Sequence, residues 1–160
     1  MPTKTYEPIA TNTLGTAAAS YTFSSIPSTY TDLIMVMSTT SANDQTQLTF
    51  NGDTGSNYSN TRIDGNGSSA GSGRSTSNAS IDIGYNNPGG QHTIIVQVLN
   101  YSNTTTFKTL LSRNNNAASI VQAIVGLWRN TSAITSMTIT AQTPNFPVGS
   151  TFTLYGIKGA

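Results

Sequence analysis

The residues that most resemble a catalytic set are Ser69, Asp82 and His92. Ser69 stands in Gly67-Ser68-Ser69-Ala70-Gly71, which fits the G-x-S-x-G pattern, and the acid and the histidine follow in the chain order of the α/β-hydrolases. That pattern needs a strand before the serine and a helix after it, because a strained turn must expose the hydroxyl. Here it lies in a Gly/Ser-rich stretch that indicates a loop, where composition alone produces such a match. We therefore predict no catalytic residues.

The same stretch also fits a dinucleotide-binding pattern. Gly65-Asn66-Gly67-Ser68-Ser69-Ala70 reads G-x-G-x-x-A, the phosphate-binding turn of a βαβ unit. No helix is indicated after it, and no acidic residue stands at the required distance after a strand. We predict no cofactor.

Metal ligands are few. The chain has no cysteine, one histidine and six acids. Asp44, Asp53 and Asp64 lie near expected turns among asparagines, and such oxygens suit calcium. No twelve-residue calcium loop is present, so we assign no metal-binding residue and leave open whether a structural cation is bound.

Tyrosines could stack on a ligand or anchor an interface. We expect most of them to cap the ends of a hydrophobic core, because tyrosine joins an apolar ring to a polar tip. Those at strand ends or turns are Tyr6, Tyr21, Tyr30, Tyr58, Tyr85 and Tyr101.

Charge is scarce and unevenly distributed. Lys and Arg number seven and Asp and Glu six, and all six acids precede Ile83. Such asymmetry helps one molecule meet an oppositely charged face of another. The basic residues after Ile83 are too few for a nucleic-acid stripe, and no apolar stretch of about 18 residues could span a membrane. We expect neither nucleic acid nor membrane as a partner.

The elements that would position these residues are strands. The 160 residues include 27 Thr, 20 Ser and 16 Asn, which favour strands and turns over helices. Residues 120–128 are long enough for a short helix, but Ile, Val and Trp favour a strand there. About ten strands are expected, at 21–23, 33–37, 48–50, 58–63, 81–83, 92–101, 107–111, 120–128, 134–141 and 151–157.

These strands predict an all-β fold, an antiparallel β-sandwich of jelly-roll type with no certain helix. We expect a polar arm at residues 1–12 and one sandwich domain at residues 13–160. Residues 65–80 contain no large apolar side chain and are predicted to form an exposed, mobile Gly/Ser-rich loop.

Three blocks of the sequence resemble small virion structural proteins of tailed bacteriophages. The blocks are YEPIATNTLGTAAASYTFSSIPSTYTDLIMV, LTFNGDTGSNYSNTRIDGNGSSAGSGRS and STFTLYGIKGA. The resemblance implies a β-sandwich part of the particle, either a capsid decoration (cement) protein or a tail-fibre module. It carries no defined binding residue to this chain.

The leading hypothesis is a non-enzymatic decoration protein that binds the major capsid protein on the outer surface of the virion and bridges its subunits. A homotrimer is expected by analogy with other phage surface proteins, because a thin core gains from oligomerisation. The N-terminal MPTKTYEPIA lacks the apolar stretch of a secretory signal, so we expect synthesis in the host cytoplasm. The alternative is a tail-fibre or receptor-binding module that contacts host surface glycans through loop-tip Tyr and Asn residues and the 65–80 loop.

Overall fold

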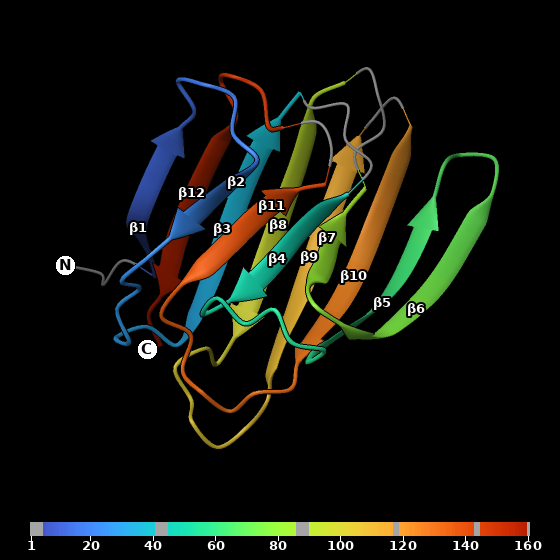
Figure 1. The fold of residues 1–160 in the computed structure, drawn as a ribbon. Coiled ribbons are helices and arrows are strands. Elements are labelled where there is room, and N and C mark those ends of the chain that lie inside the picture. Colours follow the sequence, from blue (N-terminus) through green and yellow to red (C-terminus); the bar gives the residue numbers. More distant parts are fainter. Residues whose placement is uncertain (1–4, 41–44, 86–89, 117–118, 143–144, 160) are drawn as a thin grey trace.

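The computed structural model describes residues 5–40, 45–85, 90–116, 119–142 and 145–159. These residues form twelve strands in two antiparallel sheets and contain no helix, which confirms the predicted all-β sandwich (Figure 1). Consequently, none of them belongs to a helix that could cross a membrane.

The twelve strands follow one another along the chain with short connections. They are β1 (Tyr6–Thr13), β2 (Ser20–Phe23), β3 (Asp32–Thr39), β4 (Thr46–Phe50), β5 (Tyr58–Gly65), β6 (Ala70–Asn78), β7 (Ile81–Gly84), β8 (His92–Leu99), β9 (Lys108–Asn116), β10 (Ile120–Trp128), β11 (Met137–Ala141) and β12 (Thr151–Ile157).

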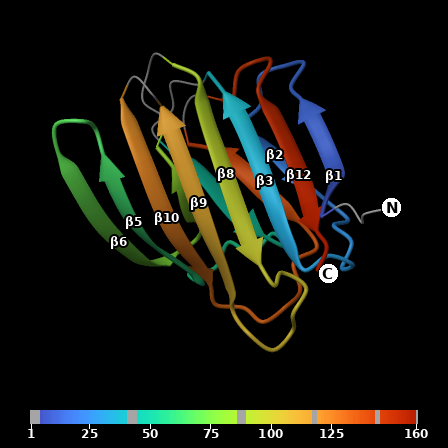
Figure 2. The same cartoon turned by 180° about the vertical axis from the view of Figure 1, so that it is seen from behind.

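The two sheets differ in size. The large sheet has the order β1-β12-β3-β8-β9-β10-β5-β6, and the small sheet has the order β2-β11-β4-β7. The small sheet covers one face of the large one, and the β5–β6 hairpin extends past its edge (Figure 1). Seen from behind, the other face of the large sheet has no described segment lying across it (Figure 2). We call this the outer face.

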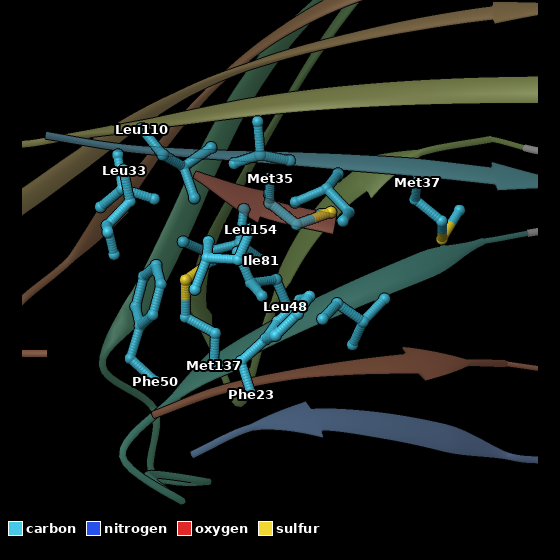
Figure 3. Close-up of a cluster of buried hydrophobic side chains, with 14 of the residues drawn as sticks. Phe23, Leu33, Met35, Met37, Leu48, Phe50, Ile81, Leu110, Met137 and Leu154 are labelled. Carbon is cyan, nitrogen blue, oxygen red and sulfur yellow. The ribbon is translucent and has the colours of Figure 1, made fainter. Parts of the chain in front are cut away.

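The core lies between the sheets because each strand alternates its side chains. In β3, Leu33, Met35 and Met37 are fully buried, whereas Ile34 and Val36 turn toward the outer face. The small sheet supplies the opposing layer, and the cluster is drawn in Figure 3. The labelled residues from the small sheet are Phe23, Leu48, Phe50, Ile81 and Met137.

Residues 120–128 form strand β10, as their β-branched and aromatic residues predict. Ile124 and Trp128 are buried on the core side, and Val121 and Val125 point outward. A strand separates these sets because successive side chains point to opposite faces.

The predicted polar arm at residues 1–12 differs from the structure. Tyr6–Thr13 is an edge strand that pairs with β12 along its length, while residues 1–4 lie outside the described residues. Pro8 is tolerated there because an edge strand leaves one row of its backbone groups unpaired, and a bulge follows between Pro8 and Ala10.

The predicted loop at residues 65–80 is also corrected. Ala70–Asn78 is strand β6, which pairs with β5 in a hairpin and forms an edge of the large sheet. Backbone hydrogen bonds suffice for an edge strand whose faces remain largely exposed, so β6 needs no large apolar side chain. With β1, this strand raises the expected ten to twelve.

Candidate functional site

An apolar surface runs along β10 on the outer face. The alternation that buries Ile124 turns four apolar side chains of β10 outward, and the neighbouring strands add one each. We call this surface the outer trough; it consists of Val121, Ala123, Val125 and Leu127 of β10, Ile63 of β5 and Leu111 of β9.

The side chains of the outer trough are exposed to an unusual degree. The exposed fraction is 64% for Ile63, 58% for Val121 and 55% for Val125. Ile63 lies opposite Ala123, and Leu111 lies opposite Val125, so the apolar groups are continuous across three strands. Monomeric soluble proteins seldom expose contiguous apolar surface of this kind without using it for binding.

The outer trough is hollowed at two places along β10. One hollow of about 440 Å³ is lined by Ile63, Val121 and Ala123 together with Asp64, Gln122 and small residues of the β5–β6 hairpin. A second of about 530 Å³ is lined by Val125 and Leu127 together with residues of β5, β6 and β9. A partner surface that projects toward β10 would fill both.

Arginines border the outer trough. Arg113 on β9 lies opposite Ala123, and Arg74 on β6 lies opposite Thr61 of β5. Arg129 follows β10, and its Nη2 donates a hydrogen bond of 3.0 Å to Ser59 Oγ, at the end of the trough where Ser59 pairs with Leu127. The border of the trough is therefore positively charged.

Asp64 follows Ile63 of the trough in the sequence, but its side chain lies on the core side of the sheet. Asp64 of β5 pairs with Gln122, which is buried on the core side of β10. Its Oδ1 lies 3.3 Å from Arg62 Nε, and the Arg62 guanidinium lies 5.5 Å from the centre of the Tyr85 ring. A Cβ on Gly71 would stand 2.8 Å from Asp64 Oδ2, so glycine leaves room for this pair over β6.

A polar groove lies between the edge of the small sheet and the β5–β6 hairpin. Its volume is about 330 Å³, and its lining includes Gln45, Gln47, Ser75, Asn78 and Asp82. Gln47 Nε2 donates a 3.3 Å hydrogen bond to Asp82 Oδ1. Burial raises the pKa of Asp82, while the bond from Gln47 and the charge of Arg62 lower it to a smaller extent. Amides and hydroxyls in this arrangement suit a ligand rich in hydroxyl groups.

The structure does not bring Ser69, Asp82 and His92 together. Ser69 lies in the β5–β6 turn, where its backbone N donates a 2.8 Å hydrogen bond to Asn66 Oδ1. His92 is buried in β8, with β9, β10 and β5 between it and β6, and Asp82 is in the small sheet. His92 Nε2 lies 3.5 Å from Asn116 Nδ2.

The dinucleotide pattern at residues 65–70 lies in the same turn. It joins two antiparallel strands rather than a strand and a helix, so its backbone does not form the phosphate cradle of a βαβ unit. Gly67 has a φ of 87°, a backbone conformation that favours glycine in this turn.

The acids considered for calcium do not converge. Asp53 lies between β4 and β5 and Asp64 within β5, each with its own hydrogen-bond partners, while Asp44 lies outside the described residues. Among the residues described, no three His, Asp or Glu side chains are placed to share a metal ion.

Asp53 instead holds a buried aromatic cluster in place. Its Oδ2 accepts a 2.7 Å hydrogen bond from Trp128 Nε1, and Asn57 Nδ2 donates to it at 2.9 Å. The Trp128 bond is the main cause of the lowered pKa of Asp53. The Tyr58 ring stacks near Trp128 with centroids 6.2 Å apart. In the sequence, the single tryptophan and the turn dipeptide Asn51-Gly52 mark the two segments that meet here. No sequence pattern indicates that Trp128 bonds to Asp53.

The tyrosines have different environments. Tyr58 and Tyr101 are fully buried, and Tyr21 packs between Phe23 and Phe152, so these three belong to the core or its margin. The Tyr85 ring lies beneath Arg62, whereas Tyr6 is 55% exposed. Tyr30 is half-buried and packs against the core.

Comparison with known proteins gives likeness of fold and no family. No protein-family model and no curated protein matches the chain. Among solved structures, an exo-inulinase from Aspergillus awamori is 11% identical with a TM-score of 0.49, over 95% of this chain and 29% of its own. A tetrameric galectin from Cinachyrella sp. is 12% identical with a TM-score of 0.37, over 86% and 99%. An alginate lyase from Aplysia kurodai is 10% identical with a TM-score of 0.36, over 84% and 72%.

These comparisons correct one expectation. The sequence predicted that the protein is not an enzyme, and that prediction is contradicted because the similar structures include an exo-inulinase and an alginate lyase. At this level of identity the likeness concerns the fold alone and assigns no activity to the chain.

Proposed function

We propose that the protein is a structural component of a tailed-phage virion, a decoration protein that binds the outer capsid surface and bridges capsid subunits. The observation that supports the proposal is the outer trough. An antiparallel sheet with one face on the core usually turns polar side chains to water on the other face. Here β10 turns Val121, Ala123, Val125 and Leu127 outward instead, beside Ile63 and Leu111.

Burial of the outer trough supplies a driving force for attachment. Covering half-exposed side chains such as Ile63, Val121 and Val125 contributes on the order of 1 kcal/mol each, because apolar area leaves water. We propose the major capsid protein as the partner. Many identical copies on one particle would add their contributions to the stability of the shell.

The first test is the number of copies per particle, measured by quantitative mass spectrometry against the major capsid protein. We expect hundreds of copies, because decoration of a capsid lattice repeats with its subunits. A few to a few tens of copies would contradict a capsid-wide role and place the protein in the tail. Its absence from purified particles would contradict the virion proposal.

The second test is a pair of matched variants. Val125→Asp places a carboxylate in the outer trough, whereas Val148→Asp makes the same change at a residue that is 63% exposed between β11 and β12. We expect Val125→Asp to lower binding to undecorated particles by on the order of tenfold or more, because a buried unpaired charge is costly. Val148→Asp should bind like the wild type. Equal binding by both variants would show that the trough is not the attachment surface.

The polar groove favours a second candidate, a tail or receptor-binding module that contacts host glycans. Gln45, Gln47, Asn78 and Asp82 present amide and carboxylate groups there. A glycan array with the wild type and Gln47→Ala tests this; binding that the variant loses supports the candidate, and no binding contradicts it.

A further inference from the structure

The outer trough is wide enough for one helix. From β9 to β6 there are three strand spacings, about 14 Å, and an α-helix with its side chains is about 10–12 Å across. From Val121 to Leu127 the floor extends six residues, about 20 Å, which matches about 13 residues of helix. The two hollows lie along this line.

The backbone of β10 favours a helix over an extended segment. β10 is hydrogen-bonded to β9 on one side and to β5 on the other, so an occupant meets only its side chains. An extended segment lying there would leave its own N–H and C=O groups without partners from the sheet. A helix satisfies these groups internally and can present an apolar stripe to Val121 and Val125.

The arginines around the trough indicate which side chains would flank the apolar stripe of a bound helix. Arg113 lies on one side, Arg74 on the other and Arg129 at one end, while Asp64 points to the opposite face. Acidic side chains along both flanks of the helix would meet these arginines. Charge complementarity of this kind fixes both the partner and its orientation.

A second copy of this chain is a poor occupant. A two-fold interface brings the same surface of each copy together, so the arginine border would face itself. The residues that the structure describes also contain no helix to offer. We therefore take a different protein as the occupant of the trough.

We propose that the outer trough binds one amphipathic α-helix of the partner protein, with an apolar stripe flanked on both sides by Asp or Glu. The inference deepens the proposed function and rests on it, because it takes the trough as the surface that attaches to the capsid.

The test uses two synthetic 14-residue peptides that share a leucine stripe. One carries Glu on both flanks and the other carries Lys. Fluorescence anisotropy of the labelled peptides gives affinity for the purified protein, and circular dichroism shows whether the peptide becomes helical on binding. We expect the Glu peptide to bind about tenfold more tightly than the Lys peptide, since two or three exposed ion pairs contribute this much together.

Matched variants locate the binding. Arg113→Glu should reduce the preference for the Glu peptide, because only Arg74 and Arg129 remain beside the trough. Lys158→Glu, which changes the net charge equally at the end of β12, should keep it. Val125→Asp should weaken both peptides, and Val148→Asp neither. High salt should reduce the preference, because it screens exposed pairs.

Several results would overturn the inference. These are no binding of either peptide, equal binding of both, or binding without a gain of helix. A dimer in analytical ultracentrifugation that Val125→Asp dissociates would assign the trough to a second copy. If the protein coats particles through Val125 but binds no peptide, only the helix inference fails. If the Glu peptide binds but particles lack the protein, only the proposed function fails.

Discussion

Trp128 Nε1 donates a 2.7 Å hydrogen bond to Asp53 Oδ2, and this bond joins the end of β10 to the connection between β4 and β5. Trp128 is 1% exposed, so its indole N–H depends on Asp53 for a partner within the protein. The same connection receives the Tyr58 hydroxyl, which donates to Asp53 O at 2.9 Å. The network therefore holds the Leu127 end of the outer trough in place from the core side.

Asp53→Asn should make the protein less stable at neutral pH and leave it little changed in acid. The pKa of Asp53 is lowered from its ordinary value of 3.8, mainly by the Trp128 bond. The carboxylate therefore stabilises the fold above the unfolded-state pKa, and this contribution is lost as the pH falls through the folded-state pKa. Urea unfolding at neutral pH should show a loss of about 1 kcal/mol in the variant. A gap between the proteins that persists unchanged in acid would contradict this account.

Tyr58→Phe should remove one source of alkaline unfolding. Burial raises the pKa of Tyr58 to about 12 from an ordinary 10.0. The neutral phenol stabilises the fold below pH 10.0, and its contribution disappears as the pH rises from there toward the folded-state value. The wild type should therefore lose more stability than the variant over that interval, as followed by thermal unfolding. Equal losses of stability in the two proteins would show that a group other than Tyr58 causes the alkaline unfolding.

Lys108→Met should destabilise the fold, because the buried Lys108 ammonium donates hydrogen bonds to two backbone carbonyls. Lys108 is 1% exposed, and its Nζ donates to Thr106 O at 2.8 Å and Thr131 O at 3.0 Å. The variant leaves both carbonyls without this donor, which should cost about 1–3 kcal/mol in urea unfolding.

The pH dependence of Lys108 has the same sign as that of Asp53 and the opposite sign to that of Tyr58. Burial lowers its pKa from 10.5, so the folded protein releases the proton first. Wild-type stability should gain relative to Lys108→Met as the pH rises through the folded-state pKa toward 10.5, because the unfolded chain then holds more protons. A constant difference between the two proteins across this interval would show that the ammonium is solvated.

Gly126→Ala tests how closely β10 approaches the small sheet. A Cβ at Gly126 would stand 2.8 Å from Ile81 Cγ2 and 3.0 Å from Leu110 Cγ. Overpacking of this kind should lower the free energy of unfolding by about 1–3 kcal/mol. Gly15→Ala is the matched control, since a Cβ there meets nothing within 4 Å. A variant as stable as the control would mean that the two sheets separate easily at this point.

The fold was predictable because its interior strands carry long apolar or alternating runs. The residues of β3, β8 and β10 could be assigned from their own side chains, and so could the two faces of β10. The edge strands β1 and β6 were missed because pairing at an edge relies on backbone groups, which every sequence provides.

The candidate site was predictable only in part. Alternation in β10 placed Val121, Ala123, Val125 and Leu127 on one face, but whether a second layer covers that face depends on the whole topology. The contacts of Lys108 with Thr131 and of Arg62 with Tyr85 join segments 23 residues apart in the sequence. No local pattern predicts such partners.

The position of β12 between β1 and β3 has a consequence for biosynthesis (Figure 1). A ribosome completes β12 after the other eleven strands, yet β12 is the neighbour through which β1 joins the large sheet. The first strand therefore has no neighbour in the sheet until β12 has emerged from the ribosome. Pairing over such sequence separations is slow because the intervening chain loses entropy before the contacts form. A nascent chain stalled before Thr151 would expose β1 and one edge of β3 to chaperones.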